Sequence, residues 1–244
     1  MRNQLDTKCH LVYNTIKSPP AFRRVSDTAT RMPGQDPPRR SGGPLAPLLG
    51  RRVNFYFAGD SMIYRVAVFI DGGYLAKIPR GHQVDLVKFP RHLADHISTG
   101  IDILRTYYYF CPPYVSPTPT PDESRRLSNY QRFQNAARRF PRFELREGDL
   151  LRYRDERGEF VFIQKKVDVL LSIDLVRLST KGQITHAAIV AGDADFVPAI
   201  QIAKDEGVSI WLFYNIPIHN SLWNAVDERI ELTPEFLEPV LRSR

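Results

Sequence analysis

Short apolar runs alternate with amphipathic segments from residue 65 to the end of the chain. Continuous apolar runs of this length predict strands that are buried on both faces, as central strands of a parallel sheet are. Three runs of this kind occupy residues 66–70, 184–191 and 208–214. A fourth predicted strand, 103–110, is rich in tyrosine.

Between these runs, apolar residues recur at spacings of three and four, which predicts amphipathic helices. The predicted helices cover residues 84–98, 122–140, 167–178 and 195–206. Two further strands, 143–154 and 159–164, flank a turn and predict a hairpin. Strands that alternate with helices predict an α/β fold, a Rossmann-like three-layer sandwich around a mainly parallel central sheet.

Residues 1–61 follow neither periodicity. Seven of the nineteen prolines lie there, so we predict a disordered, basic and proline-rich extension, followed by one domain over residues 62–244. Met62 stands four residues before the first strong strand, and we expect it to be the native start. Mass spectrometry of the natural N-terminus would test this expectation.

The net charge of +7 belongs mainly to this extension, which holds ten basic and four acidic side chains. The body holds 24 basic and 23 acidic side chains, so nucleic-acid binding by the body must rest on local patches. No apolar run is long enough for a membrane-spanning helix. Two cysteines are too few for a disulfide framework and fit a reducing, cytoplasmic location. A homo-oligomer is compatible with the sequence.

Acidic residues stand where the predicted strands end. Asp71 directly follows the first strand, Asp193 and Asp195 follow the run 184–191, and Asp168 opens a helix. Because the carboxyl ends of parallel strands share one edge of a sheet, these carboxylates are expected to meet and repel one another. Hard oxygen ligands favour Mg²⁺ or Mn²⁺ as the neutralising ion. The structural alternative is that Asp168 and Asp195 only cap helices.

Neighbouring residues extend this site. Gly72, Gly73 and Gly192 are expected to leave room for a backbone or a phosphate. Asp174 lies about 120° around the helix from Asp168, so we expect it to support the site through hydrogen bonds or to bond a neighbour instead.

Four segments together resemble the NYN domain family, in its LabA-like or DUF88 branch, which has a PIN-like nuclease fold. They are IDGGYL (70–75), KKVDVLLSIDLVRL (165–178), IVAGDADFVPAIQIAKDEGVSIWLF (189–213) and HNSLWNAVDERIEL (219–232). The resemblance spans roughly residues 64–232 and rests on the ordered set of motifs rather than on IDGG alone.

The resemblance implies a metal-dependent ribonuclease acting on RNA, which we expect to be single-stranded, with Mg²⁺ or Mn²⁺ as cofactor. The metal-binding and catalytic acids of the family fall on Asp71, Asp168, Asp193 and Asp195. One position departs from the common pattern, because many NYN proteins have Asn where this chain has Tyr74. We therefore expect Tyr74 to act only behind the metal-binding residues.

Two further positions are candidates for substrate contact. Lys166, or its neighbour Lys165, would contact a phosphate, against the alternative of a solvated helix start. Ser221 would either cap the last predicted helix or line the site.

A basic stretch supplies the remaining candidates. The predicted substrate-binding arginines are Arg125, Arg126, Arg132, Arg138 and Arg139, and Arg142 extends the run. Tyr130, Phe133 and Phe140 interleave with them at core spacing. Arginines on phosphates give affinity without sequence reading, whereas the alternative is an amphipathic helix with solvated charges.

Other chemistries lack their motifs. The chain has no H-E-x-x-H, Walker A, G-x-S-x-G or G-x-G-x-x-G pattern. A dehalogenase-type phosphatase would have Asp where Gly73 stands. Two alternatives to the ribonuclease stay open: a non-catalytic RNA-binding or regulatory module, and a phosphoesterase that acts on a small nucleotide.

Overall fold

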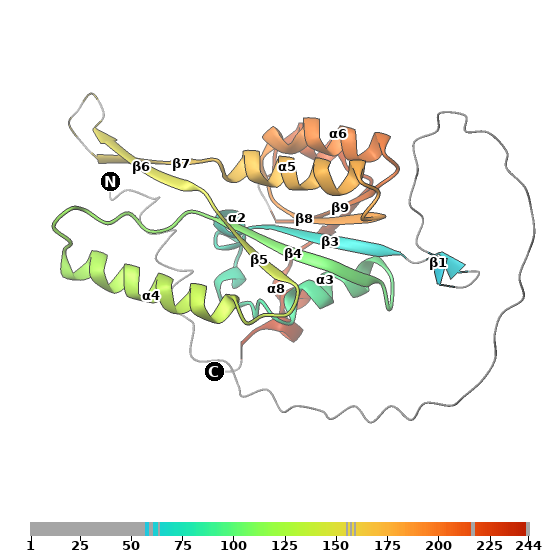
Figure 1. Ribbon diagram of the computed structural model, residues 1–244, viewed down its shortest axis with the longest axis horizontal. Helices are drawn as coiled ribbons and strands as arrows, with labels where there is room; N and C mark the ends of the chain where they lie inside the picture. Colours follow the sequence, from blue (N-terminus) through green and yellow to red (C-terminus); the bar gives the residue numbers. More distant parts are fainter. Residues whose placement is uncertain are drawn as a thin grey trace, which may run out of the picture.

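The computed structural model describes residues 57–58, 61–62, 64–154, 156, 158, 160–215 and 218–242. Its centre is a six-stranded sheet with the order β10-β9-β8-β3-β4-β5, in which every neighbouring pair is parallel (Figure 1). The strands are β3 (Arg65–Asp71), β4 (Asp102–Phe110), β5 (Phe143–Glu147), β8 (His186–Val190), β9 (Ser209–Tyr214) and β10 (Glu228–Glu231).

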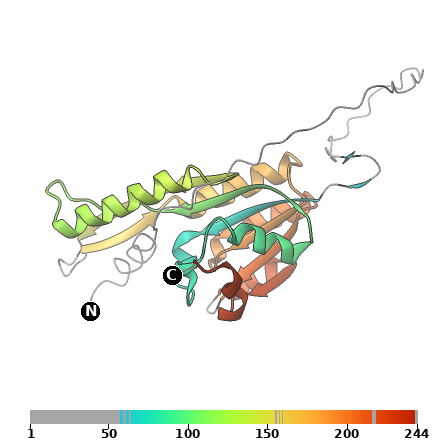
Figure 2. The ribbon, with the colours of Figure 1, turned by 90° about the horizontal axis from the view of Figure 1, so that it is seen from below.

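Helices cover both faces of this sheet (Figures 1 and 2). One face carries α5 (Val167–Thr180), α6 (Val197–Asp205) and α7 (Asn220–Ala225). The other carries α2 (Gly72–Leu75), α3 (Phe89–Ile97), α4 (Pro121–Ala137) and α8 (Pro234–Leu237). The predicted α/β sandwich with a parallel central sheet is thus confirmed.

The central strand β3 explains why its sequence is apolar throughout. Val66, Val68 and Ile70 enter the core cluster on the α3 face, whereas Ala67 and Phe69 enter the cluster under α5 and α6. Successive side chains of a strand point to opposite faces, so a strand covered on both sides needs an apolar residue at every position.

The predicted helix over 84–98 begins later than expected. Only Phe89–Ile97 is α-helical, with Pro90 in its first turn, where proline is favoured. The preceding residues form a short 3₁₀ turn over Gly81–Gln83, and Val84 pairs as an isolated bridge with Leu241. The contact with the C-terminal segment, which local periodicity does not encode, competes with the helix here.

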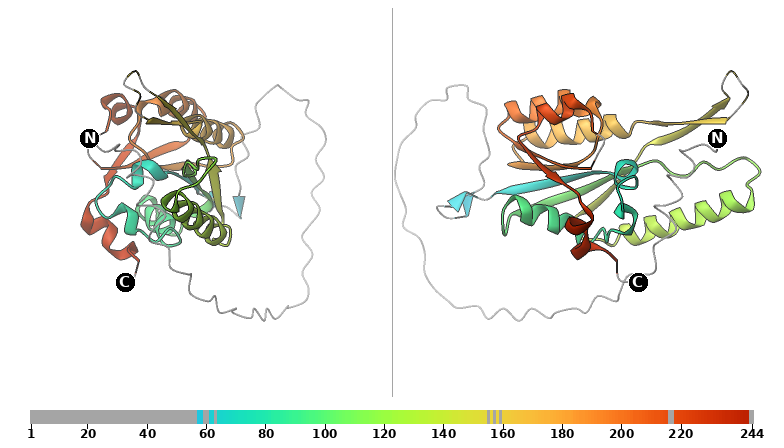
Figure 3. Two further views of the ribbon diagram at one scale, coloured as in Figure 1. Left: turned by 90° about the vertical axis from the view of Figure 1, so that its left-hand side faces the viewer. Right: turned by 180° about the vertical axis from the view of Figure 1, so that it is seen from behind.

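The predicted strand over 143–154 is two strands divided at Gly148. β5 joins the main sheet, while β6 (Asp149–Arg154) pairs with β7 (Phe160–Lys165) as a separate antiparallel hairpin. A Cβ at Gly148 would lie 2.5 Å from the Lys165 carbonyl oxygen and 2.8 Å from Val167 Cγ2, so only glycine fits the root of the hairpin. The hairpin is confirmed, and it projects past the end of the sheet (Figures 1 and 3).

Two smaller features complete the fold. The edge strand β10 has the polar sequence ERIE and was not expected. Near the start of the described chain, β1 (Phe57–Ala58) pairs with β2 (Ser61–Met62), within and beside the segment expected to be disordered. Residues 1–56 lie outside the described part, and the start at Met62 stays a prediction. Within the described residues, no helix is both long and apolar enough to cross a bilayer.

Candidate active site

Asp71 is fixed at the carboxyl end of β3, where the chain turns into α2. Its Oδ1 accepts the backbone N–H groups of Gly73 at 2.8 Å and Tyr74 at 3.1 Å, so it caps this short helix. Burial, reinforced by the nearby Asp168 carboxylate, raises the pKa of Asp71 to about 6. The two N–H groups and Lys77 lower the same pKa by smaller amounts.

Asp168 lies near Asp71 but comes from a different segment of the chain. It lies in the first turn of α5, directly after the hairpin. Burial raises its pKa, and the Asp193 and Asp195 carboxylates raise it further. The four predicted acids therefore share one electrostatic environment. Asp168 is no N-cap, since Lys166 occupies the cap position without a side-chain cap bond.

Asp193 and Asp195 are delivered by the turn that follows β8. Asp193 Oδ1 accepts the Asp195 backbone N–H at 3.1 Å and caps a 3₁₀ turn, Ala194–Phe196, which leads into α6. Asp193, rather than Asp195, is thus the capping residue, and both side chains are exposed. The predicted helix 195–206 is this 3₁₀ turn followed by α6.

The chemistry of the four acids suits a hard cation. Within the described chain none of the four acids takes part in an ion pair. Arg146 and Arg177 pair with Asp174 instead, and Lys166 pairs with Asp149. Like charges that raise one another's pKa are relieved by a divalent ion with oxygen ligands. However, no three His, Cys, Asp or Glu side chains among the described residues are arranged as a ready metal-binding group. Binding would thus require these side chains to draw together.

Tyr74 is buried, and among the described residues its hydroxyl forms hydrogen bonds with the Asn215 backbone and with none of the acids. Its hydroxyl donates to the Asn215 carbonyl at 2.5 Å and accepts the Asn215 N–H at 2.9 Å, which ties α2 to the end of β9. Its ring packs on Gly192, where a Cβ would lie only 2.2 Å from Tyr74 Cε2. The space on the Cβ side of Gly192 therefore holds a tyrosine ring, and the approach of a phosphate to this glycine stays a prediction.

We expect Gly192→Ala to displace the Tyr74 side chain. The added Cβ overlaps the Tyr74 ring, and overpacking of this kind costs about 1–3 kcal/mol, which lowers the melting temperature by roughly 2–12 °C. Thermal unfolding followed by circular dichroism measures the change. In a Tyr74→Ala background the same substitution is expected to cost much less. An equal cost in both backgrounds would contradict this packing.

Lys166 lies beside the acids but is engaged with the hairpin. It adopts a left-handed conformation with φ of 75°, which is uncommon for a residue with a side chain. Its ammonium group pairs with Asp149 at the root of the hairpin. Lys165 is exposed at the end of β7. Neither lysine forms a recorded contact with the acids within the described residues.

Ser221 does not cap α7, contrary to one of its two predicted roles. His219 is the cap, and its Nδ1 accepts the Ser221 backbone N–H at 3.3 Å and lies 2.7 Å from Ser221 Oγ. The His219 backbone N–H donates to the Gly192 carbonyl oxygen at 3.4 Å, so this histidine lies beside the turn that carries Asp193. Sequence reasoning did not assign His219 a role, although it opens the segment 219–232, because histidine is not among the residues favoured as helix caps.

Asp174 belongs to a separate, buried network. Its carboxylate accepts hydrogen bonds from Tyr109 Oη at 3.1 Å, Arg146 Nε at 2.9 Å and an Arg177 terminal nitrogen at 2.8 Å. These partners come from β4, β5 and α5 itself. The side chain thus bonds neighbours, the second of its two predicted roles, and ties a helix to the sheet.

The basic stretch lies mainly on α4, and its aromatic residues pack in or against the core. Tyr130 and Phe133 are buried and Phe140 packs against the same cluster, which supports the amphipathic alternative. Arg125 pairs with Asp122 at 2.8 Å, Arg132 bonds Asn129, and Arg142 pairs with Asp102 at 2.6 Å near the start of β4. Arg126 is partly buried, whereas Arg138 and Arg139 are exposed. In the described chain, no recorded contact joins these arginines to the four acids.

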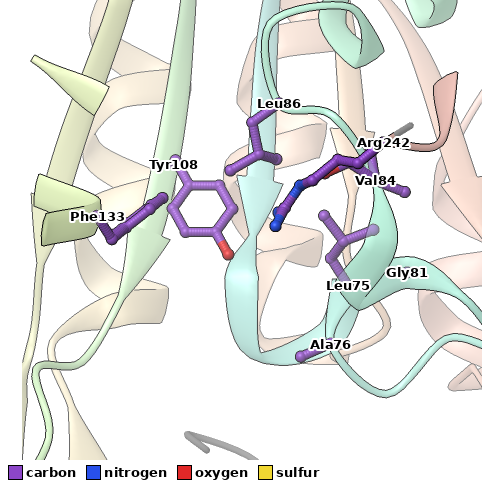
Figure 4. Close-up of a pocket in the computed structure, with 8 residues that line it drawn as sticks. All are labelled: Leu75, Ala76, Gly81, Val84, Leu86, Tyr108, Phe133 and Arg242. Carbon is purple, nitrogen blue, oxygen red and sulfur yellow. The ribbon is translucent and has the colours of Figure 1, made fainter. Parts of the chain in front are cut away.

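A small cavity under α2 is not part of this site. Its volume is about 10 Å³, room for one water molecule, and none of the four acids lines it. Its walls are largely apolar and include Leu75, Val84 and Tyr108, with the Arg242 side chain reaching in from the C-terminal segment (Figure 4).

The chain has weak likenesses to solved structures and one match to a family model. A complex of UGT2 from Phytolacca americana superposes with a TM-score of 0.28 at 14% identity, and it covers 64% of this chain and 31% of that one. A putative oxidoreductase from Parabacteroides merdae gives 0.27 at 11% identity, with 69% and 31% covered. This chain therefore spans about a third of their length, and such low scores carry no argument. No curated protein matches the sequence.

The family model for the NYN domain matches residues 65–233. This stretch runs from the first residue of β3 to the residue before α8, so it contains the whole six-stranded sheet and the four clustered acids. NYN domains are PIN-like nuclease domains, and the parallel sheet with helices on both faces agrees with that fold. The chain therefore belongs to the NYN domain family.

Proposed function

We propose that this protein is a metal-dependent ribonuclease of the LabA-like branch that hydrolyses phosphodiester bonds in single-stranded RNA. The observation that carries the proposal is the group formed by Asp71, Asp168, Asp193 and Asp195. These acids come from three separate segments and have no ion-pair partner among the described residues. The Asp168 carboxylate raises the pKa of Asp71, and the Asp193 and Asp195 carboxylates raise the pKa of Asp168.

Asp71, Asp168, Asp193 and Asp195 would hold Mg²⁺ or Mn²⁺. Such an ion supplies an activated water and neutralises charge on the scissile phosphate. Asp71 is held in place because its Oδ1 takes both backbone N–H bonds, which leaves Oδ2 for a ligand. Asp193 and Asp195 are exposed, so a metal ion and an RNA strand would have access to them. The low cysteine content of the chain, with Cys111 buried, suits a reducing, cytoplasmic setting.

A purely RNA-binding role explains the acids less well. Clustered carboxylates without a cation repel a phosphate backbone, so a module that only binds RNA gains nothing from them. A phosphoesterase for small nucleotides would use the same acids, and the experiment below separates it from the ribonuclease.

The test is cleavage of a labelled, mixed-sequence single-stranded RNA by the full chain with Mn²⁺ or Mg²⁺, beside EDTA and an Asp193→Asn variant. We expect cleavage that requires the metal and falls at least about 100-fold in the variant, the scale that loss of an outer-shell partner already reaches. Intact RNA that is nonetheless bound would support the regulatory alternative. Hydrolysis of small phosphoesters alone would support the phosphoesterase.

A further inference from the structure

Cations and aromatic rings alternate on one face of the β6–β7 hairpin. The Arg152 guanidinium carbon lies 4.2 Å from the centroid of the Tyr114 ring and 4.2 Å from that of Phe160. The Arg154 guanidinium carbon lies 4.8 Å from the Phe160 centroid. Arg154 is the cross-strand partner of Phe160, and Tyr114 belongs to the segment between β4 and α4. We call these four residues the hairpin ladder.

The stacking on aromatic rings does not neutralise the positive charges of Arg152 and Arg154. Among the described residues, neither Arg152 nor Arg154 has a recorded hydrogen bond or ion pair, unlike Lys166 at the root of the same hairpin. A guanidinium that stacks through its faces keeps its N–H donors at its edge, and this planar fork fits phosphate oxygens. Phe160 remains 39% exposed, which is unusual for so large an apolar side chain.

The hairpin ladder also lies close in the chain to the candidate active site. β7 leads directly into α5, whose first turn carries Asp168. From Phe160 to Lys165 the strand spans about 17 Å. The hairpin ladder therefore lies within a few nucleotides' length of the start of α5. In Figures 1 and 3 the hairpin projects from the end of the sheet at which α2 and the start of α5 lie.

We propose that the hairpin ladder binds the backbone and bases of single-stranded RNA and guides the strand towards Asp168 and its neighbouring acids. The inference rests on the proposed ribonuclease function and adds its substrate-binding surface. Arginine edges bind phosphates, and bases stack on aromatic rings and guanidinium planes, a combination that suits flexible single strands. The opposite face of the hairpin exposes Leu151, Tyr153 and Ile163, and its Lys165 lies across from Asp149, so among the described residues this face has no arginine stacked on a ring and is not part of the proposal.

The test compares the full-length protein with an Arg152→Gln/Arg154→Gln variant. A Lys88→Gln/Arg91→Gln variant removes two exposed charges from the α3 end instead and serves as the matched control. Binding of a fluorescent single-stranded RNA of about 20 nucleotides is measured in EDTA over a range of salt concentrations. We expect the ladder variant to bind about tenfold more weakly and its salt slope to fall by about 1.4, and the control to match wild type.

Two further measurements keep the outcome clear. Phe160→Ala is expected to weaken binding at least about fivefold while leaving the salt slope unchanged, because it removes stacking and no charge. With Mn²⁺ and RNA below saturation, the ladder variant is expected to cleave the RNA about tenfold more slowly but to hydrolyse bis(p-nitrophenyl) phosphate as wild type does. Circular dichroism melting confirms that each variant is folded.

The results distinguish the two proposals. If wild type cleaves RNA and the ladder variant binds and cleaves it equally well, the hairpin ladder is not the RNA-binding surface. If wild type cleaves nothing but the ladder variant loses RNA binding, the ladder is supported and the ribonuclease is not. If the variant changes the sedimentation mass of the protein and leaves RNA affinity unchanged, the face is an interface between copies and the inference is overturned.

Discussion

Asp71→Asn is expected to stabilise the metal-free protein and to abolish RNA cleavage. Asparagine keeps an oxygen that accepts the Gly73 and Tyr74 N–H groups, so the turn into α2 persists. It removes the charge that burial and Asp168 disfavour, and with it one of the four carboxylates available to a metal ion. Cleavage is expected to fall at least about 100-fold.

The stability gain has a defined pH dependence. The pKa of Asp71 is raised from 3.8 to about 6 in the folded protein, so the folded state binds its proton more tightly than the unfolded state. The free energy of unfolding of the metal-free protein is therefore expected to fall as pH rises from about 4 to about 7. Asp71 contributes on the order of 2–3 kcal/mol of this fall.

Urea unfolding in EDTA at pH 4.5 and pH 7.5 measures this difference. The unfolding free energy of the variant should change much less between the two pH values than that of the wild type. Added Mn²⁺ should stabilise the wild type at pH 7.5 but not the variant. A variant that is less stable than wild type at pH 7.5 in EDTA would show that Asp71 is a structural anchor and not a strained metal ligand.

Asp174→Ala is expected to destabilise the fold and to leave RNA cleavage nearly unchanged. Asp174 is 5% exposed, and its carboxylate holds the hydroxyl of the buried Tyr109 and the guanidinium of Arg146. Removing one partner of a buried, charged network leaves the others without compensation, which costs about 3–5 kcal/mol. Metal-dependent cleavage per folded molecule should stay close to wild type, because the network does not include the four acids.

Thermal unfolding and a cleavage assay well below the variant's melting temperature test this expectation. Asp174→Asn is the milder comparison, since it keeps an acceptor for Tyr109 and loses only the charge. Loss of metal binding by a folded Asp174 variant would return this residue to the candidate site. Together, the two aspartates separate a carboxylate that function requires from one that the fold requires.

The hairpin and α3 show where local pattern failed. Residues 143–154 have a continuous strand-like composition, but Gly148 divides them, since its close approach to Lys165 and Val167 lets the chain leave the main sheet. The start of α3 was misjudged because Val84 pairs with Leu241, more than 150 residues away. Both errors come from contacts between distant segments, which periodicity over a short window does not record.

Local sequence patterns were sufficient to predict the α/β alternation, the parallel central strands and the acids Asp71 and Asp193 at their carboxyl ends. These features follow from local rules: apolar residues at every position of doubly covered strands, and a common edge for strands that run in the same direction. The same rules predict that Asp71 and Asp193 lie at one edge of the sheet, because each ends or closely follows a central strand. Asp168 follows β7 of the separate hairpin, so its approach to them depends on how α5 packs.

The packing of distant segments determined the partner of each polar side chain. It assigned Asp174 to Arg146 and Tyr109, Tyr74 to the Asn215 backbone, and Lys166 to Asp149. It also brought Arg152 between rings from two separate segments. A side chain's partner depends on three-dimensional distance and on competition among all nearby groups for hydrogen bonds and charge, and neither is encoded in spacing along the chain.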